Sequence, residues 1–259
     1  MNVLDLFRLD GKRALITGGT RGLGLAMAHA LAQAGAELVI VGQNPDNLAS
    51  AKEELAKEGR HVDALQADFF KPQAVEAMCD QALAKLAPIH ILVNNVGGRR
   101  ENLPLPDQSL ADWQRLMDLN LTSAVICTRK LGAAMLPRRW GRVINIGSIC
   151  GDIAGRKIYG RHYETAKAAI AGFTRAMAVD WSPHGVTVNA IAPGPFMTDA
   201  NRRWFRERPE FQGEVETQIP LGRLGDPNEL GPLAVYLASD ASSFMTGAIV
   251  TIDGGYTLW

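Results

Sequence analysis

The chain has 259 residues, 47% of them hydrophobic, which is enough for a substantial core in one large domain or two small ones. Lys and Arg number 27, and Asp and Glu also number 27, so no net charge favours nucleic acid or an anionic membrane as a partner. Residues 1–13 carry acids and no long apolar run, unlike a secretory signal, and no stretch approaches the roughly 18 uninterrupted apolar residues of a membrane span. Cys79, Cys127 and Cys150 form no paired framework, so we expect a reducing, cytoplasmic location.

Short apolar runs alternate with longer helical patterns along the whole chain. The predicted strands are 13–17, 37–41, 61–66, 89–94, 142–146, 186–191 and 248–252. The predicted helices between them include 23–34, 45–58, 72–86, 110–136 and 159–181. This alternation favours parallel strand pairing through right-handed crossovers. We therefore predict an α/β fold: one domain over residues 1–259, with a doubly wound parallel sheet of about seven strands and helices on both faces.

One stretch, 193–226, interrupts the alternation before the last helix and strand. Long irregular connections in compact domains often cover a binding site and close over its ligand. We predict a substrate lid at about 195–224 rather than a separate domain.

The first predicted strand runs directly into "TGGTRGLG" (17–24), which opens the first helix. Gly18, Gly22 and Gly24 have the spacing GxxxGxG. Glycines there permit a tight turn and close approach of a pyrophosphate, and the helix N-terminus offers free N–H groups to phosphates. This context predicts a dinucleotide site; the alternative is a purely structural turn.

The end of the second predicted strand indicates which dinucleotide is bound. An acid there would hold the ribose 2′-hydroxyl of NAD, but the sequence is "VGQN" (41–44), with no acid before Asp46. Arg21, inside the glycine loop, is suited to a 2′-phosphate. We therefore favour NADP(H) over NAD(H). The alternative is a solvated Arg21, with Gln43 or Asn44 holding an ordinary ribose.

Tyr163 and Lys167 lie four residues apart in "YETAK", so a helix would place them on one face. An ammonium group beside a phenol favours the tyrosinate and lowers the tyrosine pKa, although such a pair also occurs on ordinary helix surfaces. Ser148 follows a predicted strand at the edge where open parallel sheets place ligands. Asn94 and Asn95 end another strand at that edge, and Asn120 lies inside a helical pattern.

In this order along the chain, these residues resemble the short-chain dehydrogenase/reductase family. The glycine loop, "NNVG", Asn120, Ser148, the Tyr163–Lys167 pair, "PG" (193–194) and "DGG" (253–255) carry a resemblance that covers nearly the whole chain. It implies a Rossmann-type domain, usually tetrameric, that moves a hydride between a nicotinamide and a carbonyl or hydroxyl carbon. Two features depart from the pattern: Val96 replaces the usual alanine, and the interval from Ser148 to Tyr163 is longer than usual by about two residues.

The resemblance also implies roles for individual residues. Tyr163 is expected to be the general acid in reduction and the base in oxidation, with Lys167 lowering its pKa and bonding the nicotinamide ribose. Ser148 is expected to hold the substrate oxygen, and Asn120 to position a water for proton relay. The cofactor-binding residues expected from the glycine loop and the resemblance together are Gly18, Thr20, Arg21, Gly22, Leu23, Gly24, Gln43, Asn44, Asp68, Phe69, Asn94, Val96, Gly97, Tyr163, Lys167, Pro193, Gly194, Phe196 and Thr198.

Cations gather on segments expected at the ligand edge, and guanidinium groups suit carboxylates. The predicted substrate contacts are Arg99, Arg100, Ser148, Arg156 and Tyr163. The alternative is solvated loop charge balanced by nearby acids. Within the family, "NNVGGRRE", "PLGRLGDPNEL" and "SSFMTGAIVTIDGGYT" resemble sugar-acid dehydrogenases acting on gluconate or deoxygluconate.

These observations lead to an NAD(P)-dependent oxidoreductase, assembled as a homotetramer, that interconverts a ketone and a secondary alcohol on a small anionic polyol or sugar acid. Two alternatives remain. One is a 3-oxoacyl-thioester reductase, whose acidic carrier would use the same cations. The other is a catalytically silent nucleotide-binding scaffold, although binding alone does not require Ser148, Tyr163 and Lys167. The five histidines lack ligand spacing, so we expect no metal site, and we expect Cys150 to serve packing rather than nucleophilic catalysis.

Overall fold

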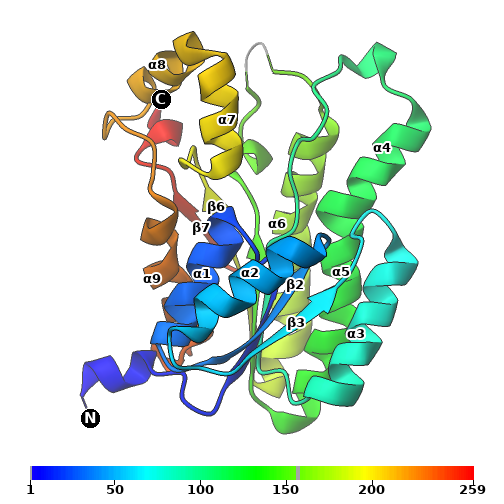
Figure 1. The fold of residues 1–259 in the computed structure, drawn as a ribbon, viewed down its shortest axis with the longest axis vertical. Helices are drawn as coiled ribbons and strands as arrows, with labels where there is room; N and C mark the ends of the chain where they lie inside the picture. Colours follow the sequence, from blue (N-terminus) through cyan, green and yellow to red (C-terminus); the bar gives the residue numbers. More distant parts are fainter. Residues whose placement is uncertain (1, 156–157) are drawn as a thin grey trace.

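The fold is a seven-stranded parallel sheet covered by helices on both faces (Figure 1). The computed structural model describes residues 2–155 and 158–259. The strands are ordered β3-β2-β1-β4-β5-β6-β7, and every neighbouring pair is parallel. Their bounds are β1 Arg13–Thr17, β2 Glu37–Gly42, β3 Val62–Gln66, β4 Ile91–Asn94, β5 Gly141–Ile146, β6 Val186–Pro193 and β7 Ile249–Ile252. The predicted fold class is confirmed.

Side chains of successive strand residues point to opposite faces of the sheet and enter two separate cores. On one face, Ile16 of β1 and Ile40 of β2 pack against α1 (Gly22–Gln33), α2 (Pro45–Ala56) and α9 (Gly231–Ala238). On the other face, Leu15 and Val39 pack against α3 (Pro72–Leu86), α5 (Ser123–Cys127) and α6 (His162–Trp181). Because both faces are covered, the central strands are apolar throughout, as the continuous runs in the sequence indicated.

The helices agree with the predicted pattern, with two differences. Their bounds are α1 Gly22–Gln33, α2 Pro45–Ala56, α3 Pro72–Leu86, α4 Leu110–Met117, α5 Ser123–Cys127, α6 His162–Trp181, α7 Asp199–Glu207, α8 Pro209–Thr217 and α9 Gly231–Ala238. The helix expected at 159–181 begins only at His162. The helix expected at 110–136 is interrupted by two widened π turns at Asp118–Thr122 and Thr128–Gly132. Such turns are rare in helices overall, and many of those that occur lie at functional sites.

The strand order reverses between β1 and β4, and this placement determines where a ligand can bind. The chain leaves β1 toward α1 on one face and leaves β4 toward the other. The loops at the carboxyl ends of β1 and β4 therefore diverge and leave a crevice, which is the general ligand position in open α/β sheets.

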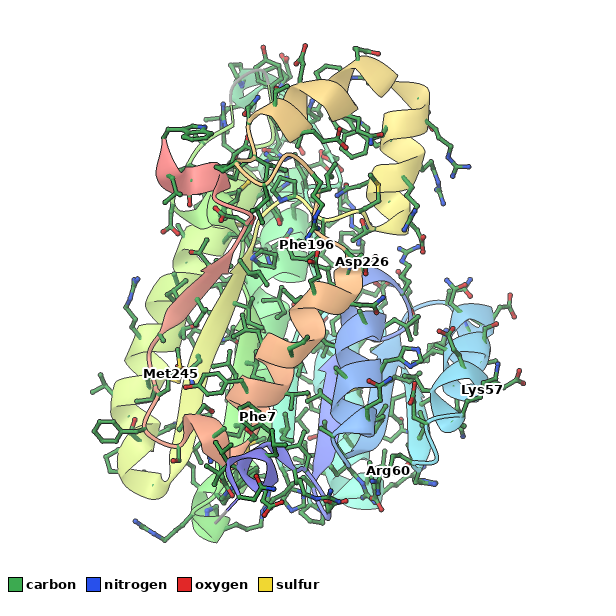
Figure 2. The ribbon with its side chains drawn as sticks, turned by 90° about the vertical axis from the view of Figure 1, so that its left-hand side faces the viewer. Phe7, Lys57, Arg60, Phe196, Asp226 and Met245 are labelled. Carbon is green, nitrogen blue, oxygen red and sulfur yellow. The ribbon has the colours of Figure 1, made fainter. Side chains whose placement is uncertain are left out.

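The segment predicted as a lid folds into α7 and α8 above the carboxyl edge of the sheet, at the top of Figure 1. Phe205, Ile219 and Leu224 form a small apolar core of their own, on which Tyr256 packs. Figure 2 shows Phe196 inside the molecule beneath these helices, beside the segment that carries Asp226. The lid region is therefore a packed substructure joined to the sheet through the residues after β6.

Candidate active site

The glycine loop lies at the carboxyl end of β1 and has the shape that a dinucleotide requires. Gly18 and Gly22 have φ values of 66° and 55°, in the region that favours glycine. A Cβ on Gly24 would collide with the carbonyl oxygen of Gly18, so α1 approaches the loop as closely as two backbones allow. The first turn of α1 therefore faces the crevice with free N–H groups, which fits a pyrophosphate.

A side-chain amide from the neighbouring strand supports this loop. Asn95 Nδ2 donates to the carbonyl oxygens of Thr17 at 2.9 Å and Gly18 at 3.2 Å. Asn94, which the sequence analysis assigned to the cofactor, is 5% exposed, and its amide donates instead to Thr128 Oγ1 and Asn145 Oδ1. Adjacent residues of a strand point to opposite faces, so the amide beside the loop is that of Asn95. We correct the assignment accordingly.

A cavity of about 440 Å³ opens beside the loop at the end of β2. It is lined by Thr20, Arg21, Gln43, Asn44, Pro45 and Asn47, so its only charged lining residue is Arg21. Asn44 Oδ1 caps α2 by accepting from the Asn47 N–H at 2.9 Å. The cavity contains the three residues expected to discriminate between the two dinucleotides.

The remaining predicted cofactor residues lie around the same crevice or beneath it. Thr198 borders the glycine loop, because a Cβ on Gly22 would lie 3.6 Å from its methyl carbon. Asp68 follows β3, and its carboxylate accepts from the Phe70 N–H at 3.1 Å. Phe69 and Phe196 are almost fully buried, so their rings pack in the cores. The other predicted positions lie in the first turn of α1, after β4 and at the end of β6, and they are Leu23, Val96, Gly97, Pro193 and Gly194.

Ser148, Tyr163 and Lys167 come together at the carboxyl end of β5. Ser148 follows the strand after one intervening residue, Gly147, and Tyr163 and Lys167 lie in the first two turns of α6. Lys167 is 4% exposed; its ammonium donates to the carbonyl oxygen of Ile146 at 2.7 Å and lies 5.7 Å from the centre of the Tyr163 ring. The two side chains share a helix face, as their spacing predicted.

The effect on the tyrosine differs from the expectation. Burial raises the pKa of Tyr163 to about 12; the Cys150 thiol also raises it, whereas the Ser148 hydroxyl and the Arg99 charge lower it. Burial lowers the pKa of Lys167 to about 8. Both shifts have the same cause, because desolvation penalises the charged form of each group. In this structure burial therefore dominates the tyrosine pKa, and the groups that lower it are Ser148 and Arg99 rather than Lys167, from which the spacing predicted the lowering.

Asn120 lies in the first π turn and is 1% exposed. Its Nδ2 donates to the carbonyl oxygens of Leu116 at 2.9 Å and Gly98 at 3.1 Å, and its Oδ1 accepts from the Gly98 N–H at 2.8 Å. Both amide donors are therefore used by the backbone. The side chain holds the loop after β4 against the helix, and this geometry differs from a free amide aimed at a relay water.

The arginines predicted to contact the substrate differ in their surroundings. Arg99 is already paired with Glu164 through two nitrogens, at 2.9 and 3.0 Å, so it does not offer a free guanidinium to a carboxylate. Arg100 adopts a left-handed φ of 59°, and burial followed by the Arg21 charge lowers its pKa. Arg156 lies outside the described residues. The sequence analysis overlooked Glu164, since its partner Arg99 lies 65 positions away and no local pattern indicates the pair.

Comparison of this chain with protein families and with known proteins agrees with the geometry of the site. A family model described as enoyl-(acyl carrier protein) reductase, one of the short-chain dehydrogenase/reductase models, matches residues 18–257. Galactitol 2-dehydrogenase (L-tagatose-forming) of Cereibacter sphaeroides is 38% identical over 260 residues, covering 100% of both chains. Gluconate 5-dehydrogenase of Gluconobacter oxydans is 37% identical over 254 residues, covering 98% of each.

Two further proteins are similar over their full length. The crystal structure of a gluconate 5-dehydrogenase from Burkholderia cenocepacia in complex with NADP and tartrate superposes with a TM-score of 0.92 at 36% identity, covering 100% of both chains. A 3-oxoacyl-[acyl-carrier-protein] reductase of Aquifex aeolicus is 34% identical, covering 96% of this chain and 98% of its own. The chain belongs to the short-chain dehydrogenase/reductase family. It is an oxidoreductase that uses a nicotinamide cofactor and acts on CH–OH groups.

No group of three His, Cys, Asp or Glu side chains in the described part of the chain, residues 2–155 and 158–259, is placed to hold a metal ion. None of its helices has the length and apolar character that a bilayer crossing requires.

The buried ammonium predicts a pH dependence of stability. The pKa of Lys167 is about 8 in the folded chain, against about 10.4 for an exposed lysine, so the unfolded chain binds this proton at higher pH than the folded chain does. The resulting loss of stability is absent above about pH 10.4, grows as the pH falls, and is complete once the pH has fallen through 8. We expect the free energy of unfolding of the wild type, relative to Lys167→Met, to rise by about 2 to 3 kcal/mol between these pH values. Denaturant titrations of both proteins measure this; a constant difference would contradict the assigned burial cost.

Proposed function

We propose that the protein interconverts a ketone and a secondary alcohol on a sugar acid or polyol by hydride transfer, in the manner of gluconate 5-dehydrogenase. The observation that carries the proposal is the convergence of Ser148, Tyr163 and Lys167 beside a glycine loop shaped for a dinucleotide. The full-length similarity to polyol and sugar-acid dehydrogenases supports the substrate class. Of the two arginines in the loop after β4, Arg99 is paired with Glu164, so Arg100 is the one proposed to meet an anionic substrate.

The roles follow from the chemistry of each side chain. The cofactor supplies the nicotinamide ring that accepts or donates the hydride. Tyr163 removes the hydroxyl proton at its phenol oxygen in oxidation and returns it in reduction, and Ser148 hydrogen-bonds the same substrate oxygen. Ionisation of Tyr163 is unfavourable in a buried site, so the Ser148 hydroxyl and the positive charges near the ring stabilise the tyrosinate when it forms. Asn120 keeps the loop after β4 in register with this site.

NADP(H) is the proposed preference over NAD(H). The cavity at the end of β2 contains Arg21 and lacks an acidic lining residue, which favours a 2′-phosphate over a 2′-hydroxyl. The related crystal structure was solved with NADP. The glycine loop, Arg21, Gln43 and Asn44 would hold the dinucleotide, with Thr198 at the lid side.

Residues 195–224 are the proposed lid. Thr198 borders the glycine loop while its hydroxyl caps α7 by accepting from the Asn201 N–H at 3.3 Å. A cofactor that contacts Thr198 would therefore bear directly on the first turn of α7. Closure over the substrate would exclude water from the site.

A homotetramer in the cytoplasm is the proposed form of the enzyme. Val179 on α6, Phe244 and Trp259 are 77%, 105% and 79% exposed, and neighbouring subunits would cover these apolar side chains in the proposed assembly. Tyr256, by contrast, is covered by the lid, because its hydroxyl donates to Gln218 Oε1 at 2.8 Å. We expect light scattering to give the mass of four chains; the mass of one chain would reject the assembly.

The 3-oxoacyl-thioester reductase remains the second candidate, because a reductase of that class is similar over the whole chain. A scan with the preferred cofactor distinguishes the two. We expect turnover of 5-ketogluconate to exceed that of an acetoacetyl thioester. Substantial turnover of only the thioester would reverse the order.

The same assay tests the role of the phenol. In Tyr163→Phe, we expect cofactor binding to persist and turnover to fall by at least about two orders of magnitude, the usual scale for loss of a general acid–base group. Tyr236→Phe on α9, whose ring packs on Phe7, is the matched control and should retain activity. Full activity in Tyr163→Phe would mean that another residue supplies the proton, and a silent scaffold would show no turnover in the wild type.

Arg21→Ala tests the cofactor preference. Loss of a charged hydrogen bond to a phosphate is worth about 1.5–3 kcal/mol, so we expect the Kd for NADPH to rise at least about tenfold while the Kd for NADH changes little. Fluorescence titration measures both. Arg60→Ala is the control, because Arg60 lies at the opposite end of the sheet (Figure 2). Equal weakening of both dinucleotides would assign Arg21 to a shared part of the cofactor.

A further inference from the structure

Two loops that are distant in sequence are bonded together beside Tyr163. The segment 99–103 follows β4, and the segment 159–164 leads into α6. The Tyr159 N–H donates to Asn102 Oδ1 at 2.6 Å, and the Gly160 N–H donates to the Leu103 carbonyl oxygen at 3.0 Å. The start of α6, where Tyr163 lies, is thus held from outside the helix, and the helix receives no side-chain cap of its own.

Arg99 is at the centre of this junction and binds the residues on both sides of Tyr163. Its guanidinium donates to both carboxylate oxygens of Glu164, at 2.9 and 3.0 Å, and to the Tyr159 carbonyl oxygen at 2.6 Å. Its own carbonyl oxygen lies 2.7 Å from the ring nitrogen Nε2 of the buried His162. The guanidinium carbon lies 5.0 Å from the centre of the Tyr163 ring.

We propose that Arg99 is a positioning residue that holds the phenol of Tyr163 at its reacting place and supplies the positive charge that lies nearest to its ring among the described residues. The inference rests on the proposed acid–base role of Tyr163. A planar guanidinium with two parallel hydrogen bonds has a defined orientation, which a flexible ammonium lacks. Displacement of a catalytic group by about 1 Å can cost about a hundredfold in rate, so a rigid clamp on both neighbours of the phenol has a direct consequence for turnover.

The charges around the phenol make the proposal specific. Arg99 faces the ring from the loop after β4, Glu164 and Lys167 face it from α6, and Cys150 faces it from the turn after β5. The Arg99 charge lowers the pKa of Tyr163, and the Glu164 charge raises it. Glu164 also accepts from Arg161 Nη1 at 3.0 Å, so the carboxylate belongs to a network of three charges. Within it Arg99 and Glu164 act on the phenol in opposite directions, and single substitutions separate the two effects.

The test is the pH dependence of kcat for alcohol oxidation, which rises as Tyr163 loses its proton. In Arg99→Gln the positive charge is lost. We expect the midpoint of the rising limb of the kcat–pH profile to move to higher pH by about half a pH unit or more, and the limiting kcat to fall about tenfold. In Glu164→Gln the negative charge is lost, and we expect the limb to move to lower pH. Arg99→Lys keeps the positive charge but loses the two parallel hydrogen bonds of the guanidinium. The rising limb should therefore stay near its wild-type position while the limiting kcat falls.

Arg13→Gln is the matched control. Arg13 Nε and Nη2 both bond Glu37 Oε2, and its Nη1 donates to the Leu86 carbonyl oxygen, but this pair lies at the amino edge of the sheet. Its loss should change the unfolding free energy without moving the limb.

Shifts of the Arg99 and Glu164 variants in the same direction, or no shift in folded proteins, would overturn the inference. A rise in KM for anionic substrates alone would return Arg99 to substrate binding and would also overturn it. Activity retained by Tyr163→Phe would instead overturn the proposed function.

Discussion

Parallel pairing of β1 with both β2 and β4 is the constraint on which the site depends. A parallel sheet collects every strand end of one polarity along a single edge, so side chains separated by more than a hundred residues meet there. The glycine loop, Asn95 and Ser148 all follow strands at this edge. Because the chain departs to opposite faces after β1 and β4, the edge opens into a crevice at that point. Helices α7 and α8 lie over the same edge rather than the other one.

The proposed acid–base residue Tyr163 and its neighbour Lys167 are held in surroundings that oppose their charged forms. Burial raises the pKa of Tyr163 and lowers that of Lys167, so the folded chain stores an electrostatic cost at the site. Sites of this kind are commonly less stable than an apolar alternative would be. Under the proposed mechanism, the site tolerates this cost because it stabilises a negative charge on Tyr163 that forms only during the reaction. The hydroxyl of Ser148 and the guanidinium of Arg99 stand where that charge would develop.

The two arginines of the loop after β4 show that neighbouring charges in the sequence can have different partners in the folded chain. Arg99 and Arg100 are adjacent in sequence, yet one is bound to an acid from α6 and the other lies near Arg21 with a left-handed backbone. An arginine that bonds both oxygens of a carboxylate acts as a structural link between two segments, since most of its five N–H donors are already hydrogen-bonded within the protein. An arginine without an acid partner among the described residues remains suited to an anionic ligand.

Much of the molecule was predictable from the sequence, because the relevant interactions are local or periodic. The alternation of apolar runs and helices predicted the seven strands, and the glycine spacing and the Tyr163–Lys167 interval predicted the loop and the shared helix face. Three features were decided only by the tertiary structure: which of Asn94 and Asn95 faces the glycine loop, the direction in which the pKa of Tyr163 moves, and the pairing of Arg99 with Glu164. Each depends on side-chain direction, burial or contact between residues far apart in the chain, and none of these quantities is a property of a short sequence window.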